Sequence, residues 1–374
     1  MDSDLTVITE GATKAQVFKD YLDQPKGPKG HITDTVFYNP EMALCRDLGV
    51  GLVSVLERRK WSALDGMAGT GIRGLRLAIE SHQDIHVLLN DHNPVAYRMM
   101  LNNIEMNGVA NATAVNKKLG TVLAEEAFDL IDLDPFGTPV HFIHPALCSI
   151  RNKGVLAVTA TDTAVLCGTY NKACRRRYLA TPIRSTIMHE AGLRILMGFI
   201  VREAAKLELG AAPLMAHATQ HYMRIYARFE KGSKCADRAL AKLGTVVFDP
   251  KTQTVSESGP GVVGGPLWKP PMQDPEVLGK MVGLRGTFAR PEQYADMCET
   301  LLQEAGMPAW FYEINKVGHV LKMMSPSMSD LSTRLESMGY RWCRSHIAPN
   351  TIRTDAPYED FIKAFKGAHG EKVI

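Results

Sequence analysis

Residues 64–74 read LDGMAGTGIRG and decide the fold that this sequence predicts. They follow a short apolar run and lead into GIRGLRLAIE, whose apolar residues have helical spacing. Gly69 and Gly71 allow the positive φ angles of a tight turn and let backbone N–H groups approach a ligand closely. The start of a helix then favours a carboxylate or a phosphate. The stretch therefore predicts a strand, a ligand-binding loop and a helix.

Short apolar runs alternate with amphipathic stretches from Trp61 to about residue 160. Such alternation is typical of a parallel sheet covered by helices. A long helix is expected over residues 186–209, and residues 213–232 are expected to add antiparallel strands to the same sheet. Farther on, the sequence predicts a hairpin near 249–251, helices near 293–304 and 329–338, and a tail with a strand, a loop and a helix.

The predicted fold class is α/β, with a Rossmann-like domain and a smaller C-terminal α/β (α+β) domain. A length of 374 residues agrees with two or three domains. Residues 1–36 are predicted to be an N-terminal arm, because QPKGPKG at 24–30 cannot continue a helix or a central strand. A Gly/Lys/Ser break at 231–234 sets the other boundary. The predicted domains are thus residues 37–232 and 233–374.

The composition excludes several classes of protein. Hydrophobic residues make up 45% and charged residues 22%, which is typical of a folded globular chain. A net charge of +3 is too small to indicate nucleic-acid binding by itself. The chain has no long apolar run and begins with the acidic MDSDLTVITE, so neither a membrane span nor a signal peptide is expected. Seven cysteines without a C-x-x-C pair predict reduced thiols, no zinc site and a cytoplasmic location.

Two features of the loop leave the ligand open. The spacing of Gly69, Gly71 and Gly74 is G-x-G-x-x-G, which dinucleotide enzymes also use. Asp91 follows the next predicted strand about twenty residues later, where a carboxylate can accept hydrogen bonds from ribose hydroxyls. Nucleotide and S-adenosylmethionine sites both need such an acceptor. Alternatively, Asp91 caps the helix that begins near Pro94.

The apolar run 128–133 ends in Asp134-Pro135-Phe136-Gly137 and discriminates between these ligands. At the carboxyl end of a strand, the ring of Phe136 can stack on a base while Asp134 accepts a hydrogen bond from an exocyclic amine. Such an amine is a poor nucleophile, so a group that takes up its proton assists its attack on a methyl donor. Hydride transfer has no use for this arrangement. The alternative is an ordinary turn after the strand. This alternative is disfavoured because the glycine loop and Asp91 precede the motif in the same chain.

Several strings together resemble one enzyme family, the tRNA guanine-26 N2-dimethyltransferases. They are VFYNPEMALCRD at 36–47, LDGMAGTGIRG at 64–74, DLDPFG at 132–137, TATDTAVLCG at 159–168, CRRRY at 174–178 and HIAPNTIRTDAPY at 346–358. The resemblance runs from about Val36 to the C-terminus. It implies a class I methyltransferase fold, S-adenosyl-L-methionine as the cofactor and two successive transfers to the 2-amino nitrogen of guanine.

The resemblance also implies roles for individual residues. Arg46 and Arg73 would contact the methyl donor, and Asp91 its ribose. The donor pocket would further include Asp65, Gly69 and Gly71. Asp134 would accept the amine proton, with Pro135 in the same platform, and Phe136 and Phe37 would contact the faces of the base. An arginine fork suits the donor's carboxylate, and aromatic faces suit a base lifted out of its stack.

This chain departs from the family at two places. Where the family has an Asp-Ala pair near the adenine, the chain reads Asn116-Lys117-Lys118-Leu119-Gly120. The adenine contact would then come from the backbone N–H of Leu119 or Gly120. Some members carry a four-cysteine zinc site in the C-terminal half, and only Cys235 falls in the part of this chain that corresponds to that site. No metal is therefore predicted.

A basic cluster follows the fifth predicted strand and is the predicted tRNA-binding surface. Its members are Lys172, Arg175, Arg176, Arg177 and Arg184. This is the edge of the sheet where substrates enter such folds, so the cluster is expected to contact tRNA phosphates. The alternative is a merely solvated face.

The predicted function is S-adenosylmethionine-dependent dimethylation of N2 of guanine 26 in tRNA. The predicted partner is tRNA, with no membrane and no obligatory protein partner. Two alternatives remain open at this stage. One is methylation of another exocyclic amine or amide, in DNA adenine or protein glutamine, and the other is a noncatalytic tRNA-binding factor.

Overall fold

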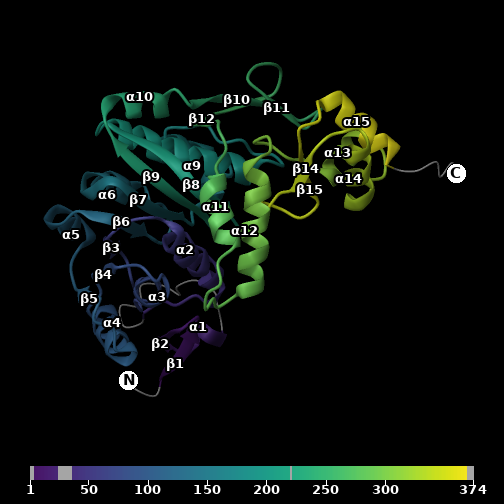
Figure 1. The fold of residues 1–374 in the computed structure, drawn as a ribbon. Coiled ribbons are helices and arrows are strands. Elements are labelled where there is room, and N and C mark those ends of the chain that lie inside the picture. Colours follow the sequence, from purple (N-terminus) through teal and green to yellow (C-terminus); the bar gives the residue numbers. More distant parts are fainter. Residues whose placement is uncertain (1–3, 24–35, 220, 369–374) are drawn as a thin grey trace. The chain divides into compact units, whose positions relative to one another are not determined.

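The computed structural model describes residues 4–23, 36–219 and 221–368. Within these residues, the main sheet has seven strands in the order β5-β4-β3-β6-β7-β9-β8 (Figure 1). In chain order they are β3 (Trp61–Asp65), β4 (Ile85–Asn90), β5 (Ala112–Val115), β6 (Phe128–Leu133), β7 (Ile150–Ala160), β8 (Leu209–Ala218) and β9 (Met223–Lys231). The strands from β5 to β7 pair in parallel. Four residues join the neighbours β8 and β9, a connection that only antiparallel strands can make. The predicted α/β fold class is confirmed.

Helices connect the parallel strands, as the alternation in the sequence predicted. They are α3 (Ile72–Glu80), α4 (Pro94–Asn107), α5 (Leu119–Glu125) and α6 (Val140–Ser149). The strand order changes direction between β3 and β6, and ligands of such sheets bind beyond the carboxyl ends of the strands at this point. β3 leads into the glycine loop and β6 leads into Asp134. The fold thus brings the two predicted motifs to the same edge of the sheet.

The remaining elements include most of those expected downstream. Before the sheet come β1 (Leu5–Glu10), β2 (Thr13–Phe18), α1 (Asp20–Asp23), the short 3-10 helix η2 (Pro40–Met42) and α2 (Ala43–Val55). After β7 come α7 (Thr163–Leu166), α8 (Asn171–Tyr178), α9 (Met188–Ala205), α10 (Ser233–Leu240), β10 (Leu243–Asp249), β11 (Thr254–Ser256), β12 (Val262–Trp268), α11 (Pro275–Val282), α12 (Pro291–Ala305), β13 (Tyr312–Glu313), α13 (Ile314–Leu321), α14 (Met328–Ser337), β14 (Trp342–Arg344), β15 (Thr351–Thr354) and α15 (Tyr358–Gly367). Helices α9, α12 and α14 and the β10–β11 hairpin confirm the predicted elements.

The chain divides into two compact units that alternate along the sequence. The first comprises Met1–Thr159, Tyr226–Gly232 and Glu276–Cys298, and the second comprises Ala160–Ile225, Ser233–Pro275 and Glu299–Ile374. One of the points where the chain passes from one unit to the other lies after Gly232, where the sequence predicted a domain boundary. The predicted domain limits stay a prediction. Of the predicted arm, residues 5–18 form the hairpin β1–β2 in the first unit, while QPKGPKG lies outside the described residues.

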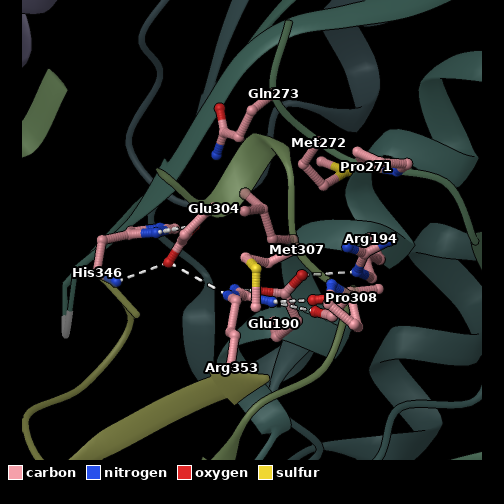
Figure 2. Close-up of a pocket in the computed structure, with 12 residues that line it drawn as sticks. Glu190, Arg194, Pro271, Met272, Gln273, Glu304, Met307, Pro308, His346 and Arg353 are labelled. Atoms are coloured by element: carbon pink, nitrogen blue, oxygen red, sulfur yellow. Dashed lines mark hydrogen bonds and ion pairs between the residues drawn. The ribbon is translucent and has the colours of Figure 1, made fainter. Parts of the chain in front are cut away.

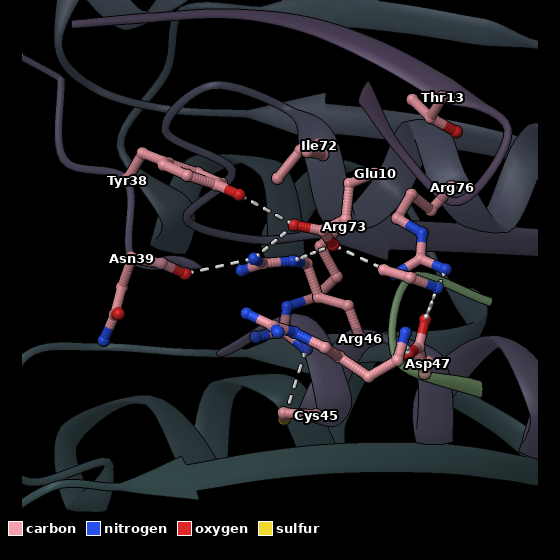
Figure 3. A network of polar contacts seen from close by, with 12 residues as sticks. Glu10, Thr13, Tyr38, Asn39, Cys45, Arg46, Asp47, Ile72, Arg73 and Arg76 are labelled. Carbon is pink, nitrogen blue, oxygen red and sulfur yellow. Dashed lines mark hydrogen bonds and ion pairs between the residues drawn. The ribbon is translucent and has the colours of Figure 1, made fainter. Parts of the chain in front are cut away.

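A buried network of charges ties this hairpin to α2 and α3 (Figure 3). Glu10 accepts hydrogen bonds from Nε and Nη2 of Arg46, both at 2.6 Å, and from Nη1 of Arg76 at 2.9 Å. Arg76 also pairs with Asp47 at 2.6 Å and with Glu80 at 2.7 Å. Burial opposes the charged form of Glu10, but the two guanidinium groups outweigh it and lower the pKa of this carboxyl to about 2. The helices that carry Arg46 and Arg73 are therefore fixed to the N-terminal hairpin.

A second buried network holds the C-terminal elements of the second unit together (Figure 2). Glu190 of α9 pairs with Arg194 at 2.7 Å and with Arg353 of β15 at 2.8 Å. Glu304 of α12 accepts from the backbone N–H and from Nδ1 of His346, both at 2.8 Å. Burial opposes ionisation of Glu304, but His346 and Arg353 outweigh it and lower its pKa to about 2. His346 and Arg353 belong to the HIAPNTIRT string, so part of that motif joins α9, α12 and β15.

Replacing Arg353 with methionine should therefore destabilise the second unit. Glu190 and Glu304 would keep their buried carboxylates without this cation, a loss worth about 3–5 kcal/mol of unfolding free energy. Urea unfolding of Arg353→Met measures it. The control is Arg341→Met, because Arg341 is 70% exposed and pairs at the surface with Asp355. Equal effects of the two substitutions would contradict the role given to Arg353.

Candidate active site

The glycine loop has the backbone conformation that its sequence predicts. The φ angles of Gly69 and Gly71 are +54° and +78°, and Gly71 is the N-cap of α3. The N–H of Gly74 donates to Oδ2 of Asp65 at 3.0 Å. A Cβ at Gly74 would lie 2.2 Å from Cδ2 of Leu89, so only glycine lets α3 pack this closely on the sheet. Asp65, at the end of β3, thereby holds the first turn of α3.

Asp91 follows β4 and contacts the loop directly. Its Oδ2 accepts from the N–H of Gly69 at 3.0 Å, and its Oδ1 accepts from the N–H of Asn93 at 2.9 Å. The N-cap of α4 is Asn93, whose side chain accepts from Val95 N at 2.8 Å. The alternative of Asp91 as the cap of α4 is therefore wrong, because Asn93 performs that role. The ribose contact of Asp91 stays a prediction.

The segment that departs from the family lies beside Asp91. Nδ2 of Asn116 donates to the carbonyl of Asp91 at 2.8 Å. Leu119 and Gly120 are the first two residues of α5, where backbone N–H groups have no partner within the helix itself. The side chain of Leu119 packs against Gly66, with its Cδ1 3.1 Å from the position of a Cβ there. The start of α5 thus lies against the glycine loop, and its adenine contact stays a prediction.

Three carboxylates meet one guanidinium at the ends of β3 and β6. Asp65 and Asp132 are aligned partners on these two strands, and Asp134 lies two residues beyond Asp132. Arg73, from the first turn of α3, donates through Nη2 to Oδ2 of Asp134. Its Nε lies 3.7 Å from Oδ1 of Asp132, and its Nη1 donates to Sγ of Cys45 at 3.7 Å. The side chain of Asp134 is 27% exposed, whereas Asp65, Asp132 and Arg73 are buried.

Burial and neighbouring charges change the ionisation of two members of this cluster. Burial and the neighbouring Asp132 raise the pKa of Asp65 to about 7, against the opposing effect of Arg73. Burial by itself would lower the pKa of Arg73, but Asp132 and Asp134 hold it well above its ordinary value. Arg73 therefore stays charged, while burial and Asp132 favour the protonated form of Asp65. The cluster brings three carboxyl groups to one guanidinium.

The two predicted base-binding rings are in contact. Phe37 and Phe136 pack edge to face with centroids 5.1 Å apart, and Tyr21 packs on Phe37 in the same way at 5.2 Å. The side chain of Phe136 is 64% exposed. Pro135 beside it is buried. An exposed aromatic face next to Asp134 suits a stacked base.

Arg46 lies in the network around Glu10 (Figure 3). Its guanidinium forms a two-point pair with Glu10, and its Nη2 also donates to the carbonyl of Asn39 at 3.0 Å. The Tyr38 hydroxyl donates to Glu10 at 2.9 Å. The structure thus brings Arg73, Asp65 and Asp134 together, whereas Arg46 has a carboxylate partner of its own. Its contact with the donor stays a prediction.

The predicted tRNA-binding residues of the second unit divide into two groups. Lys172, Arg175 and Arg176 lie on the exposed face of α8, and the structure gives them no ion pair within its described residues. Arg177 instead pairs with Asp162 at 3.0 Å. Arg184 is exposed, with its backbone beside Gly168.

Asp162 also accepts from the Tyr178 hydroxyl at 2.6 Å, so the TATD and CRRRY strings meet at this carboxylate. Asp162 thus binds two residues of α8, Arg177 and Tyr178. These two contacts fix the rotation of α8 and therefore the direction of its exposed basic residues. Tyr178 is fully buried and packs on Phe199.

Reasoning from the sequence missed two residues of these surfaces. Asp132 belongs to the carboxylate cluster, and its signal was the alternation in DLIDLD, which places Asp132 and Asp134 on one face of an extended chain. Tyr170 is 60% exposed at the N-cap of α8, beside the basic residues. No pattern distinguished it from the buried tyrosines.

Other kinds of site find no support in the described part of the chain. Among residues 4–23, 36–219 and 221–368, no three His, Cys, Asp or Glu side chains lie together in a way that could hold a metal ion. In the same residues, no helix has the length and apolar character needed to cross a membrane. Burial raises the pKa of Cys167 and of Cys174 to about 12, so these thiols are not activated as nucleophiles.

A family model, "N2,N2-dimethylguanosine tRNA methyltransferase", matches residues 23–366. The chain belongs to this family. The tRNA (guanine(26)-N(2))-dimethyltransferase of Pyrococcus furiosus is 36% identical over 394 aligned positions, covering 98% of this chain and 100% of the relative. That of Pyrococcus abyssi is 37% identical over 358, covering 89% and 93%.

A solved structure extends the agreement to the fold. The structure of Trm1 from Pyrococcus horikoshii in complex with S-adenosyl-L-methionine superposes with a TM-score of 0.85 at 35% identity. The match covers 96% of this chain and 99% of the other. The class I fold expected from the sequence, joined to further C-terminal elements, is therefore that of a dimethyltransferase of this family over nearly the whole chain.

The strained loop of this family member offers a test. Alanine at position 71 would have to adopt a φ of +78° with its Cβ 3.0 Å from Cδ1 of Leu89. The left-handed conformation costs about 1–2 kcal/mol for a residue with a Cβ, so Gly71→Ala should lower the unfolding free energy and weaken S-adenosylmethionine binding. Urea unfolding and calorimetric titration measure the two effects. Gly279→Ala is the control, because a Cβ there meets nothing within 4 Å. Wild-type donor affinity in Gly71→Ala would contradict the role of the loop.

Proposed function

We infer that this chain catalyses the reaction of its family, the transfer of two methyl groups from S-adenosyl-L-methionine to N2 of guanine 26 in tRNA. The observation that carries this conclusion is family membership over residues 23–366. The geometry agrees, because the glycine loop, Asp134 and Phe136 lie at one switch point of the sheet. Membership also decides against the alternatives of DNA adenine, protein glutamine or a noncatalytic factor.

The residues of the first unit fit the donor. Backbone N–H groups of the loop around Gly69 and Gly71, the carboxylate of Asp91 and the start of α5 would bind its polar groups. Arg73 and Arg46 would bind its carboxylate. When bound, S-adenosylmethionine supplies an electrophilic methyl group on a sulfonium. The carboxyl groups of Asp132 and Asp134 would favour a cation nearby.

Asp134 is proposed to accept the amine proton. Its carboxylate is partly exposed beside the open face of Phe136, so a base stacked on this ring can present its amine to Asp134. Conjugation with the purine ring withdraws electrons from the amine, so uptake of the proton by Asp134 would raise its reactivity in the transition state. The buried Pro135 would keep the two side chains at a fixed spacing, and Phe37 would support the ring of Phe136.

The exposed face of α8 is proposed to contact tRNA phosphates. Lys172, Arg175 and Arg176 supply charge that no carboxylate of the described chain offsets. Arg184 is the fourth candidate, and Arg177 contributes less because Asp162 already pairs with it. Tyr170 joins this surface as an aromatic on which a nucleotide can stack.

The proposal also covers the domains, the location and the partners of the chain. Residues 37–232 are proposed to form the methyltransferase domain, and residues 233–374 a C-terminal domain that binds tRNA. A cytoplasmic location is supported by cysteines that are all free within the described residues. The proposal includes no obligatory protein partner and no metal.

The first test replaces the proton acceptor. Asp134→Asn keeps the size of the side chain but cannot take up a proton, so transfer to tRNA should fall by a factor of about 100 or more. Radiolabelled donor and nucleoside analysis measure transfer of the first and second methyl groups. Donor binding, followed by calorimetry, should persist.

Asp355→Asn serves as the control for removing a carboxylate outside the cluster, and it should keep full activity. Transfer at the wild-type rate by Asp134→Asn would overturn the assignment of Asp134.

The second test concerns tRNA binding. Each phosphate contact contributes about 0.7–0.9 to the slope of log affinity against log salt, so Arg175→Ala combined with Arg176→Ala should reduce this slope by roughly 1.5. Filter binding over a range of salt concentrations measures it. The control variant combines Lys206→Ala and Lys363→Ala, because these lysines already pair with Glu203 and Asp360. An unchanged slope in the arginine variant would refute the phosphate contacts.

A further inference from the structure

We propose that Arg73 is a positioning residue for Asp134, in addition to its expected contact with the methyl donor. One guanidinium would thus serve both halves of the reaction, holding the proton acceptor in its charged, aimed form while it binds the donor's carboxylate. The inference rests on the proposed function, since it assigns to Asp134 the role of proton acceptor.

The contacts of Arg73 carry this inference. Its Nη2 donates to Asp134, and its Nε faces Asp132 at 3.7 Å. Arg73 itself comes from the first turn of α3, which Gly71 and the bond from Gly74 to Asp65 fix in place. A rigid, buried cation therefore holds a carboxylate that is itself partly exposed. The direction of Asp134 is set by α3 and not by its own loop alone.

The opposite edge of the guanidinium is suited to a second anion. Nη1 donates to the thiol of Cys45 at 3.7 Å, and a thiol is a weak acceptor. A carboxylate of the donor could bind at that edge without displacing Asp134 from Nη2. Arginine has five N–H groups in a planar fork, so it can pair with two carboxylates at once, whereas lysine offers a single point charge.

Electrostatics explain why Asp134 needs this partner. Among the described residues, the titratable groups near the Arg73–Asp134 pair include Asp132 on β6, Asp65 on β3, Cys45 on α2 and Tyr226 on β9. Each of these four groups is an acid. Without Arg73, Asp134 would lie beside two further carboxyl groups and would take up a proton at a higher pH. A protonated Asp134 would donate a hydrogen bond and could not accept the amine proton.

Replacing Arg73 with a neutral residue should raise the pH that activity requires. Loss of the positive neighbour disfavours the charged form of Asp134, which is the form proposed to accept the proton. For an aspartate next to an arginine the change is about one to three pH units. We therefore expect the acid limb of the rate profile to move to higher pH by at least about one unit in Arg73→Gln.

The experiment measures single-turnover transfer of the first methyl group from about pH 5 to about pH 9, with S-adenosylmethionine saturating for each variant. Saturation removes the effect of weaker donor binding. Arg73→Lys restores a positive charge, so its acid limb should return close to that of the wild type while its donor affinity stays low. Asp91→Asn should weaken donor binding and leave the acid limb where it is.

An acid limb in Arg73→Gln that coincides with that of the wild type would overturn the proposal and leave Arg73 as a donor contact alone. If Arg73→Gln does not fold, Arg73→Met is measured with the same expectation, because its side chain is uncharged and of similar length.

A second measurement separates this proposal from the proposed function. In protein labelled with ¹³C at the aspartate carboxyl carbons, the signal of Asp134 is the one missing from Asp134→Asn. Its titration should move to higher pH in Arg73→Gln, whether or not the protein methylates tRNA. An unchanged titration would overturn the positioning role, whereas failure of the proposed function would show itself only as absent methyl transfer.

Discussion

The parallel pairing of β3 with β6 is the constraint on which the candidate site depends. It sets Asp65 opposite Asp132 and brings the loop after β3 beside Asp134. Two buried acids in register would repel each other, and Arg73 reaches them because Gly74 lets α3 lie close to the sheet. The close packing of α3 on the sheet thus determines the position of the Arg73 guanidinium. The chemistry of the site follows from this backbone geometry.

Both units use buried charge to join segments that are far apart in the sequence. Glu10 gathers Arg46 and Arg76 in the first unit, and Glu190 gathers Arg194 and Arg353 in the second. A buried ion pair adds little net stability by comparison with apolar packing, yet loss of one partner is costly. Such networks favour one arrangement of the segments over others. They suit a site whose residues lie on separate elements.

The sequence predicted the features that depend on local spacing. The turn at Gly69 and Gly71, the strand ending at Asp134 and the long helix α9 follow from patterns a few residues long. Contacts between distant positions could not be predicted in this way. Glu10 lies 36 residues from Arg46, and no pattern in the predicted arm distinguishes this acid from its neighbours. The sequence-based prediction therefore gave Arg46 a contact with the donor and did not include its pairing with Glu10.

The contacts of the basic cluster could not be predicted from the sequence either. Composition could not separate Arg177 from Arg175 and Arg176, because only the rotation of α8 brings it to Asp162, 15 residues earlier in the chain. Likewise, Asp132 was visible in the sequence as one acid of an alternating run, but its pairing with Asp65 depends on which strands become neighbours. Strand order is a property of the whole sheet.

The N-terminal hairpin has a practical consequence for anyone who prepares this protein. Glu10 stands at the end of β1 and is a counter-ion of helices α2 and α3. A truncation that removes β1 would remove Glu10 as well. It would thereby remove the two-point partner of Arg46, while Arg76 would keep Asp47 and Glu80. The first strand therefore contributes a charge to the packing of α2 and α3.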